Sequence, residues 1–283
     1  MSPSSRRLRL GVIGHVEHIV LGRVPRVPRP GDIAHLQSPV WFPGGGGGVT
    51  FHQLVRSSSE VHLFTAIGND EAGQQVERAI AATGAHVHAA RRAAAHTRDI
   101  VMIEPNGERT IVVVGEPLHP SIDDPLPWHL LDELDAVYFT AQDPQVLARA
   151  RTARILVSTA RRQPSIRAAN IDLDVVVGSR ADPREVSDRA DYARPPRAVV
   201  MTEGAKGGTV ETKSGTMRFK APILKTVHGG AYGAGDSFAG ALVHFIALGA
   251  TPLEAAKRAA PFGAAVLAAL DPLRAQQELP DHL

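Results

Sequence analysis

Residues 229–249 read GGAYGAGDSFAGALVHFIALG, a stretch that joins a glycine-rich loop to an amphipathic segment. Five apolar side chains after Asp236 recur at helical spacing, which predicts a helix that begins near Asp236 and buries one face: Phe238, Ala241, Leu242, Phe245 and Ile246. Gly249 is typical of a helix end. Thr251 and Glu254 then form a capping-box pattern, so a second helix follows directly.

The loop before this helix can bind an anion. Gly233, Ala234 and Gly235 carry almost no side chain, so backbone N–H groups at the positive end of the helix are accessible. A carboxylate at such a helix start, here Asp236, can accept a proton from a hydroxyl and act as the general base of a phosphoryl transfer. The alternative is purely structural: Asp236 or Ser237 caps the helix, and the glycines form a tight turn.

The rest of the chain alternates short β-branched runs with helical patterns, which indicates βα units on a largely parallel sheet. The expected strands are residues 9–13, 61–67, 136–140, 154–158, 173–177 and 198–202. The expected helices are residues 49–56, 71–82, 144–151 and 182–189. We therefore expect one enlarged α/β domain over residues 1–283.

Two segments interrupt this alternation, residues 17–41 and 99–114, and both have the pattern of antiparallel strands. In the second segment, DIVMIE and RTIVVV flank Asn106 and Gly107, a pair that supplies positive φ for a turn. We expect these strands to form a small separate sheet. Two interpretations remain open, a lid over an active site and an extension of the sheet edge.

The composition excludes several classes of function. The 283 residues include 31 Lys plus Arg and 29 Asp plus Glu, so the near-neutral charge gives no sign of a nucleic-acid surface. The chain has no cysteine, which excludes disulfides, thiolate nucleophiles and cysteine metal sites. The longest uncharged helical stretch, residues 238–253, contains His244 and Pro252 and is too short to span a bilayer. We expect a soluble, cytoplasmic protein.

Two motifs in this order and spacing resemble a known family. The segment GAGDSFAGAL, residues 233–242, resembles the C-terminal signature of the ribokinase-like (PfkB) carbohydrate and nucleoside kinases. PGGGGGVTFHQL, residues 43–54, and VHLFTAIGNDEAGQQVERAI, residues 61–80, resemble its sugar-site loop and the strand and turn that follow. The resemblance implies a doubly wound α/β fold with a small β lid. It also implies transfer of phosphate from ATP to a sugar-like hydroxyl, with Mg²⁺ beside the nucleotide and Asp236 as base.

The same resemblance assigns a nucleotide segment. Residues 202–207, TEGAKG, are similar to the family's strand-to-loop element, in which Thr202 and Gly204 approach the phosphates and Gly207 completes the turn. Lys206 is either a phosphate contact or a solvated loop lysine.

The acceptor side implied by the resemblance departs from the family pattern. Gly44 and Gly45 would let a polyol lie against the backbone. Family members carry an Asp after the first strand, and the nearest acid here is Glu17. Asp32 is a second candidate for binding hydroxyls, with a plain turn acid as the alternative. Val49 stands where the family has a sugar-binding Asn.

Two further departures concern ions. The family's magnesium-linked Asn-x-x-Glu element corresponds to residues 179–182, which keeps an acid, Asp182, but loses the amide. The Asp-Thr pair before the GAGD motif is Gly230 and Ala231. Because this removes oxygen ligands that suit K⁺, we predict weak or absent K⁺ activation.

Three alternatives concern acceptor and partner. A nucleoside acceptor would need an apolar surface for its base, for which Val40, Trp41 and Phe42 are candidates. An inactive ligand-binding or regulatory relative is the non-enzymatic reading. Lid edges at residues 20–41 and 101–114 further suggest a homodimer that pairs across a two-fold axis.

Overall fold

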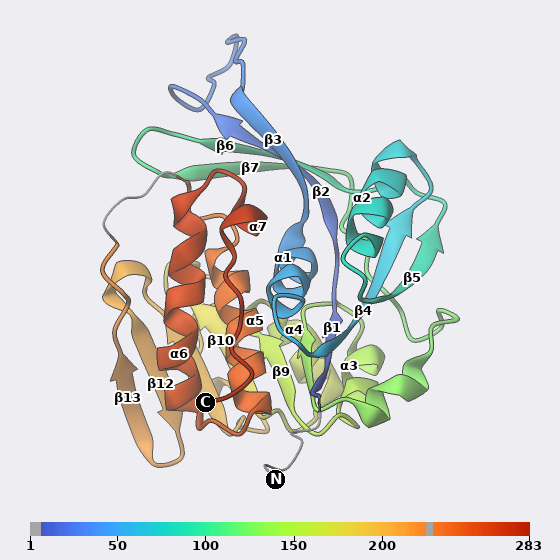
Figure 1. Cartoon of the computed structure of the whole chain (residues 1–283), viewed down its shortest axis with the longest axis vertical. Coiled ribbons are helices and arrows are strands. Elements are labelled where there is room, and N and C mark those ends of the chain that lie inside the picture. The colour runs from blue at the N-terminus through green and yellow to red at the C-terminus, as the bar shows by residue number, and fades with distance from the viewer. Residues whose placement is uncertain (1–6, 225–228) are drawn as a thin grey trace.

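A computed structural model describes residues 7–224 and 229–283 of the chain. A large sheet runs through its centre, in the order β13-β12-β11-β10-β9-β8-β1-β4-β5 (Figure 1). Its strands are β1 (Arg9–Ile13), β4 (Glu60–Gly68), β5 (His86–Arg92), β8 (Ala136–Phe139), β9 (Leu156–Thr159), β10 (Val175–Ser179), β11 (Ala198–Thr202), β12 (Gly208–Thr212) and β13 (Gly215–Phe219).

The path of the chain through this sheet is doubly wound. The chain runs outward from β1 to β4 and β5, then returns to β8 on the other side of β1 and continues through β9, β10 and β11. All these neighbours pair in parallel, whereas β12 and β13 form an antiparallel hairpin at the edge. The direction of winding therefore reverses between β1 and β8, where α/β folds commonly bind ligands.

Helices cover both faces of the sheet. One hydrophobic cluster joins the sheet to helices that lie in front of it in Figure 1: α1 (Gly45–Leu54), α2 (Glu71–Ala81), α5 (Ala234–Ala247) and α6 (Pro252–Ala265). A second cluster packs α3 (Pro144–Ala150) and α4 (Gln163–Ala169) against the opposite face. The short helix α7 (Pro272–Ala275) lies against α1. The expected α/β class and helix-covered parallel sheet are confirmed.

The two interrupting segments form a separate four-stranded sheet, called the lid below. Its strands lie in the order β3-β2-β6-β7: β2 (Glu17–Arg23), β3 (Gln37–Gly44), β6 (Arg98–Ile103) and β7 (Arg109–Val114). The lid crosses the upper end of the molecule in Figure 1, above the ends of α1 and α5. The predicted hairpin is confirmed, with Gly107 at φ +83° in a turn that Glu104 and Glu108 close.

One predicted helix is wrong. Residues 182–189 form turns and lead into a short 3₁₀ turn, Arg189–Asp191. The Asp182 carboxylate accepts hydrogen bonds from the backbone N–H and the guanidinium of Arg184. Such local side-chain bonding competes with the helical hydrogen-bond ladder.

Two helices begin earlier than the pattern predicts. The helix α5 starts at Ala234, so the GAGD motif forms its first turn. The helix α1 starts at Gly45, inside the glycine run. A Cβ atom on Gly47 would lie 2.5 Å from the backbone oxygen of His15, so only glycine lets this turn pass the end of β1. Tertiary packing here outweighs the low helix propensity of glycine.

No helix in the described ranges is long and apolar enough to cross a membrane.

Candidate active site

The candidate site lies where the winding of the sheet reverses. The chain leaves β1 at Gly14 and leaves β8 at Thr140, whose N–H donates to the Ile13 oxygen at 2.8 Å. A Cβ atom on Gly14 would lie 2.4 Å from the Thr140 side chain. The carboxyl ends of β1 and β8 therefore meet in close contact.

Asp236 stands at this point in the first turn of α5. Gly233 caps the helix at φ +78°, a conformation that glycine adopts readily. A Cβ atom on Gly235 would meet no atom within 4 Å, so the backbone of this first turn borders open space at Gly235. The Ala234 N–H donates to the Ala231 oxygen at 3.4 Å. Burial raises the pKa of Asp236 to about 6, and the charge of Glu185 contributes. Arg161 and Arg109 act in the opposite direction.

The glycine run faces Asp236 across a narrow space. A Cβ atom on Gly46 would lie 3.1 Å from Thr140 Oγ1 and 3.4 Å from Asp236 Oδ1. Gly45 has a φ of +74°, and a Cβ atom on Gly45 would lie 2.9 Å from Glu17 Oε2. Gly44 is instead packed against Ile19 and Tyr232. The predicted glycine surface is thus displaced by one residue, to Gly45 and Gly46.

Glu17 is paired with a second acid that the sequence reading missed. Glu17 begins β2 and Asp99 lies on the neighbouring lid strand β6; both carboxyl groups are buried and hydrogen-bonded to each other. Burial raises the pKa of both groups, and the charge of Asp99 raises that of Glu17 further. The pair therefore holds a proton near neutral pH, which lets it both donate and accept hydrogen bonds.

Two histidines and an arginine line the same space and were also missed. His15 Nε2 accepts a hydrogen bond from the Gly46 N–H at 3.2 Å, and its ring lies 5.0 Å from that of His119. Burial lowers the pKa of both histidines, that of His119 to about 3. The charge of Arg162, whose Nε donates to the Thr140 oxygen at 2.8 Å, lowers the pKa of both histidines further.

The predicted nucleotide segment lies farther along the same edge of the sheet. Thr202 ends β11, and β9 and β10 separate it from β8. Its hydroxyl donates to the Gly178 oxygen at 3.2 Å. Gly204 and Gly207 both have positive φ, and a Cβ atom on Gly207 would lie 2.1 Å from the Phe219 oxygen. Lys206 is exposed in this turn.

Asp182, the predicted metal-linked acid, is surrounded by arginines. Arg161 reaches it at 2.5 Å and Arg184 at 3.0 Å, and these contacts hold its pKa well below the usual range. Glu185 pairs with Arg161 through Oε1 alone. Mg²⁺ prefers carboxylate oxygens and water as ligands. Both oxygens of Asp182 accept hydrogen bonds from arginines, whereas only one oxygen of Glu185 does, so Glu185 is the more available ligand of the two. Its charge also reaches Asp236.

Another group of possible metal ligands lies away from this space. Glu60, His62 and His86 gather at the starts of β4 and β5, the opposite edge of the sheet. Arg9 binds Glu60, and both nitrogens of His62 already have hydrogen-bond partners.

Two predicted acceptor residues do not join the site. Asp32 lies in the loop between β2 and β3 that projects at the top of Figure 1, where it pairs with Arg26 at 2.7 Å. Val49 is fully buried in the lid cluster and packs beside Gly233. The proposed nucleoside surface is divided as well. Phe42 is buried in the lid, whereas Trp41 is 38% exposed and donates its indole N–H to His18.

Comparisons with known proteins identify the family and the fold. The model of the "pfkB family carbohydrate kinase" matches residues 8–171 and 168–272. A search of curated proteins found no significant match. The ribokinase from Thermotoga maritima has 19% identity and a TM-score of 0.79, with 96% of each chain covered. The Arabidopsis thaliana ribokinase complexed with ribose and ATP has 14% identity and a TM-score of 0.73, with 96% of each chain covered.

A third structure, the adenosine kinase from Sinorhizobium meliloti, has 16% identity and a TM-score of 0.74 over 98% of this chain and 97% of that one. These distant structures show the shared fold, and the family model adds membership. The chain belongs to the PfkB family of carbohydrate kinases, phosphotransferases that have an alcohol group as acceptor.

Proposed function

We propose that the protein transfers the γ-phosphate of ATP to a hydroxyl of a sugar or sugar-like acceptor, with Asp236 as general base. One observation carries this proposal. A partly buried carboxylate whose pKa is raised to about 6 stands in the first turn of α5, facing the bare backbone of Gly46. Base and anion-binding N–H groups thus lie within one helical turn, as deprotonation and phosphate transfer require.

The surrounding residues would divide the work. The Glu17–Asp99 pair and the backbone at Gly45 would bind acceptor hydroxyls, and Asp236 would take the proton of the reacting one. The first-turn N–H groups from Gly233 to Gly235 would bind the transferred phosphate. Mg²⁺, when bound with ATP, would neutralise phosphate oxygens, and Glu185 with Asp182 offers the carboxylates on that side.

The divided aromatic surface favours a sugar over a nucleoside. Stacking of a base needs an exposed apolar face, yet Phe42 packs against Tyr232 inside the lid. The non-enzymatic alternative has less support, because Asp236 and the helix start keep the arrangement that catalysis needs.

Coupled measurement of ADP release tests the proposal. The panel contains neutral sugars, sugar acids, sugar phosphates and nucleosides. We expect ADP release that depends on an acceptor from the sugar groups. Release that only nucleosides stimulate would replace the sugar by a nucleoside. Binding of a panel member without ADP release would support the non-enzymatic alternative.

We also propose that the lid pairs two copies of the chain. Six of its side chains are apolar and exposed: Trp41, Ile100, Ile111, Val112, Val113 and Val114. The edge strands β3 and β7 also leave backbone groups free for pairing. Light scattering should give twice the chain mass, and Val113→Lys should shift the protein toward monomer. A monomer at all concentrations would contradict the proposal.

A further inference from the structure

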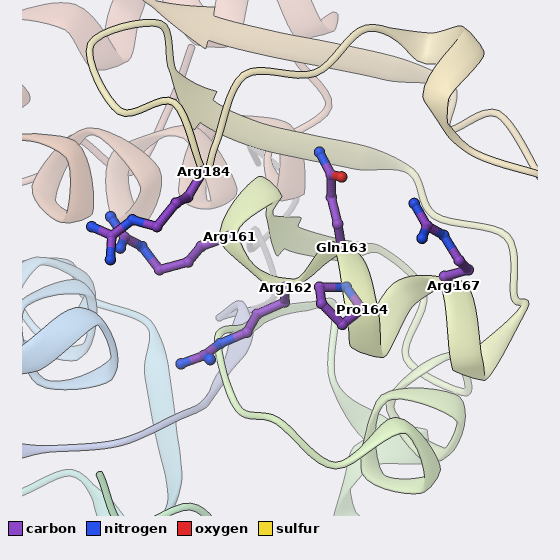
Figure 2. Close-up of a pocket in the computed structure, with 6 residues that line it drawn as sticks. All are labelled: Arg161, Arg162, Gln163, Pro164, Arg167 and Arg184. Atoms are coloured by element: carbon purple, nitrogen blue, oxygen red, sulfur yellow. The ribbon is translucent and has the colours of Figure 1, made fainter. Parts of the chain in front are cut away.

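A cationic hollow of about 500 Å³ opens beside the site, where α4 begins. Four of its six lining residues are arginines, and the full set is Arg161, Arg162, Gln163, Pro164, Arg167 and Arg184. Figure 2 shows Arg161, Arg162 and Arg184 extending toward the same side, whereas Gln163 and Arg167 extend in other directions. All three side chains line the same hollow.

The charges of these arginines are not equally compensated. Arg161 binds Glu185 and Asp182 at 2.6 and 2.5 Å, and Arg184 shares Asp182. Arg162 has no acid within 4.0 Å anywhere in residues 7–224 and 229–283; its Nε donates to the backbone oxygen of Thr140 at 2.8 Å. Burial and the charge of Arg161 lower the pKa of Arg162 to about 10, so it stays charged at neutral pH.

The surroundings of Arg162 belong to the acceptor side. Its charge acts on His15 and His119 and interacts with Glu17, all at the β1, β8 and lid side of the cleft. Both ring nitrogens of His119 are buried without a hydrogen-bond partner in the part of the chain described. A partly buried cation without a counter-ion destabilises the protein, and so does an imidazole whose nitrogens have no hydrogen-bond partner. A ligand that pairs with both groups would remove this cost.

We propose that the acceptor carries an oxyanion, a carboxylate or a phosphate ester, which Arg162 and His119 bind while the Glu17–Asp99 pair holds hydroxyls. The guanidinium presents parallel N–H groups that match either anion. His119 adds one N–H donor from its neutral ring. The inference rests on the proposed function, because it names the class of acceptor that this site phosphorylates.

The contacts of Arg162 argue against the competing assignment, a contact with the phosphates of ATP. Arg162 bonds to the end of β8, whereas the predicted nucleotide segment follows β11, beyond β9 and β10. Arg161 and Arg184, which reach the acids after β10, are closer to that side.

Calorimetric titration of the full chain without nucleotide tests this inference through matched ligands that differ by one anionic group. The pairs are D-gluconate with D-glucitol, D-glucose 6-phosphate with D-glucose, and D-ribose 5-phosphate with D-ribose. We expect the anionic member of at least one pair to bind ten times or more tightly than its neutral partner. The pair that shows this ratio separates a carboxylate from a phosphate ester.

Variants assign the preference to Arg162. Arg162→Gln should bring the ratio close to one, and Arg162→Lys should retain part of it. Arg194→Gln removes the same charge from a side chain outside this hollow, where it pairs with Asp172, so it should keep the ratio. Thermal unfolding of each variant separates a loss of the charge from a loss of the fold.

Three results would overturn the inference. They are equal binding within every pair, binding of no pair, or an Arg162→Gln variant that loses affinity for ADP while its acceptor ratio is unchanged. Because the titration needs no turnover, failure of ADP release with a preserved anion preference would refute the proposed function alone.

Discussion

The site has two sides at the carboxyl ends of the strands, one after β10 and β11 and the other after β1 and β8. On the β10–β11 side, acids and arginines near the surface form ion pairs. On the β1–β8 side, polar groups are buried and some lack a hydrogen-bond partner. Asp182 binds two arginines, and Glu203 binds Arg218 at 2.5 Å. On the β1–β8 side, Glu17 and Asp99 are buried and hydrogen-bonded to each other, and neither ring nitrogen of His119 has a hydrogen-bond partner within the described ranges. The charges on the β10–β11 side are therefore paired, whereas buried polar atoms on the β1–β8 side lack hydrogen-bond partners.

The two sides therefore differ in their contribution to stability and in their need for a ligand. Neutralised surface ion pairs contribute little and demand no ligand. Buried polar atoms without partners destabilise the unliganded protein, and a ligand that pairs with them removes that cost. We therefore expect substrate discrimination on the β1–β8 side, and Asp236 lies between the two sides.

The largest expected effect is that of Asp236→Asn, which removes the charge of the proposed general base. Loss of a general base should lower kcat by about 10²- to 10⁴-fold. Steady-state kinetics measures kcat, and calorimetry should show that ADP still binds. The matched substitution Asp172→Asn, at an exposed acid paired with Arg194, should leave kcat unchanged. A variant that keeps the wild-type kcat would show that Asp236 is not the base.

Gly46→Ala should act on the acceptor side alone. The new methyl group would lie between Thr140 Oγ1 and Asp236 Oδ1, so we expect the acceptor KM to rise by about 10- to 100-fold. The ATP KM should change little. Alanine is the better helix former, so thermal unfolding should show no loss of stability from helix propensity. Equal increases in both KM values would contradict the separation of the two sides.

Glu185→Gln should move the pH profile of kcat/KM, in addition to any loss of rate from the proposed Mg²⁺ contact. Asp236 must be ionised to accept a proton, so kcat/KM should fall as the pH drops below its pKa of about 6. The negative charge of Glu185 raises that pKa, and its removal should shift the acidic limb to lower pH by roughly half a unit. Glu211→Gln is a control remote from Asp236. A shift toward higher pH would contradict the assigned electrostatics.

The smallest expected effect concerns monovalent cations. Gly230 stands where the resemblance expects an oxygen ligand, and a Cβ atom there would lie 2.4 Å from Ile103 Cδ1 of the lid. We therefore expect rates in K⁺ and in tetramethylammonium buffers to agree within about twofold, which is under 0.5 kcal/mol. A strong stimulation by K⁺ would show that other oxygens hold the ion.

Much of the fold follows from local patterns. The buried β-branched runs predicted β1, β4, β8, β9, β10 and β11 but not β5, and Asn106 with Gly107 predicted the lid hairpin, because these signals lie within a few residues of one another. The helix predicted at residues 182–189 was wrong because bonds of Asp182 to Arg184 and Arg161 formed instead. The glycine start of α1 depends on its close approach to His15, which no local pattern reports.

The site was only half predictable. Asp236 and its glycines lie on one contiguous motif, so a sequence reading found them. Asp99, His119 and Arg162 come from a lid strand, a loop and the start of α4, and only the fold brings them to Glu17. Glu185 was not predicted; its position three residues after Asp182 was the feature of the sequence that could have identified it.

Transfer of labelled phosphate tests the central claim most directly. The chain is incubated with γ-labelled ATP and the anionic and neutral acceptors above, and the products are separated. We predict label on an alcohol oxygen of an acceptor, at a rate that Asp236→Asn lowers by about 10²- to 10⁴-fold. Label that appears only as inorganic phosphate, or equal transfer by the variant, would contradict the account.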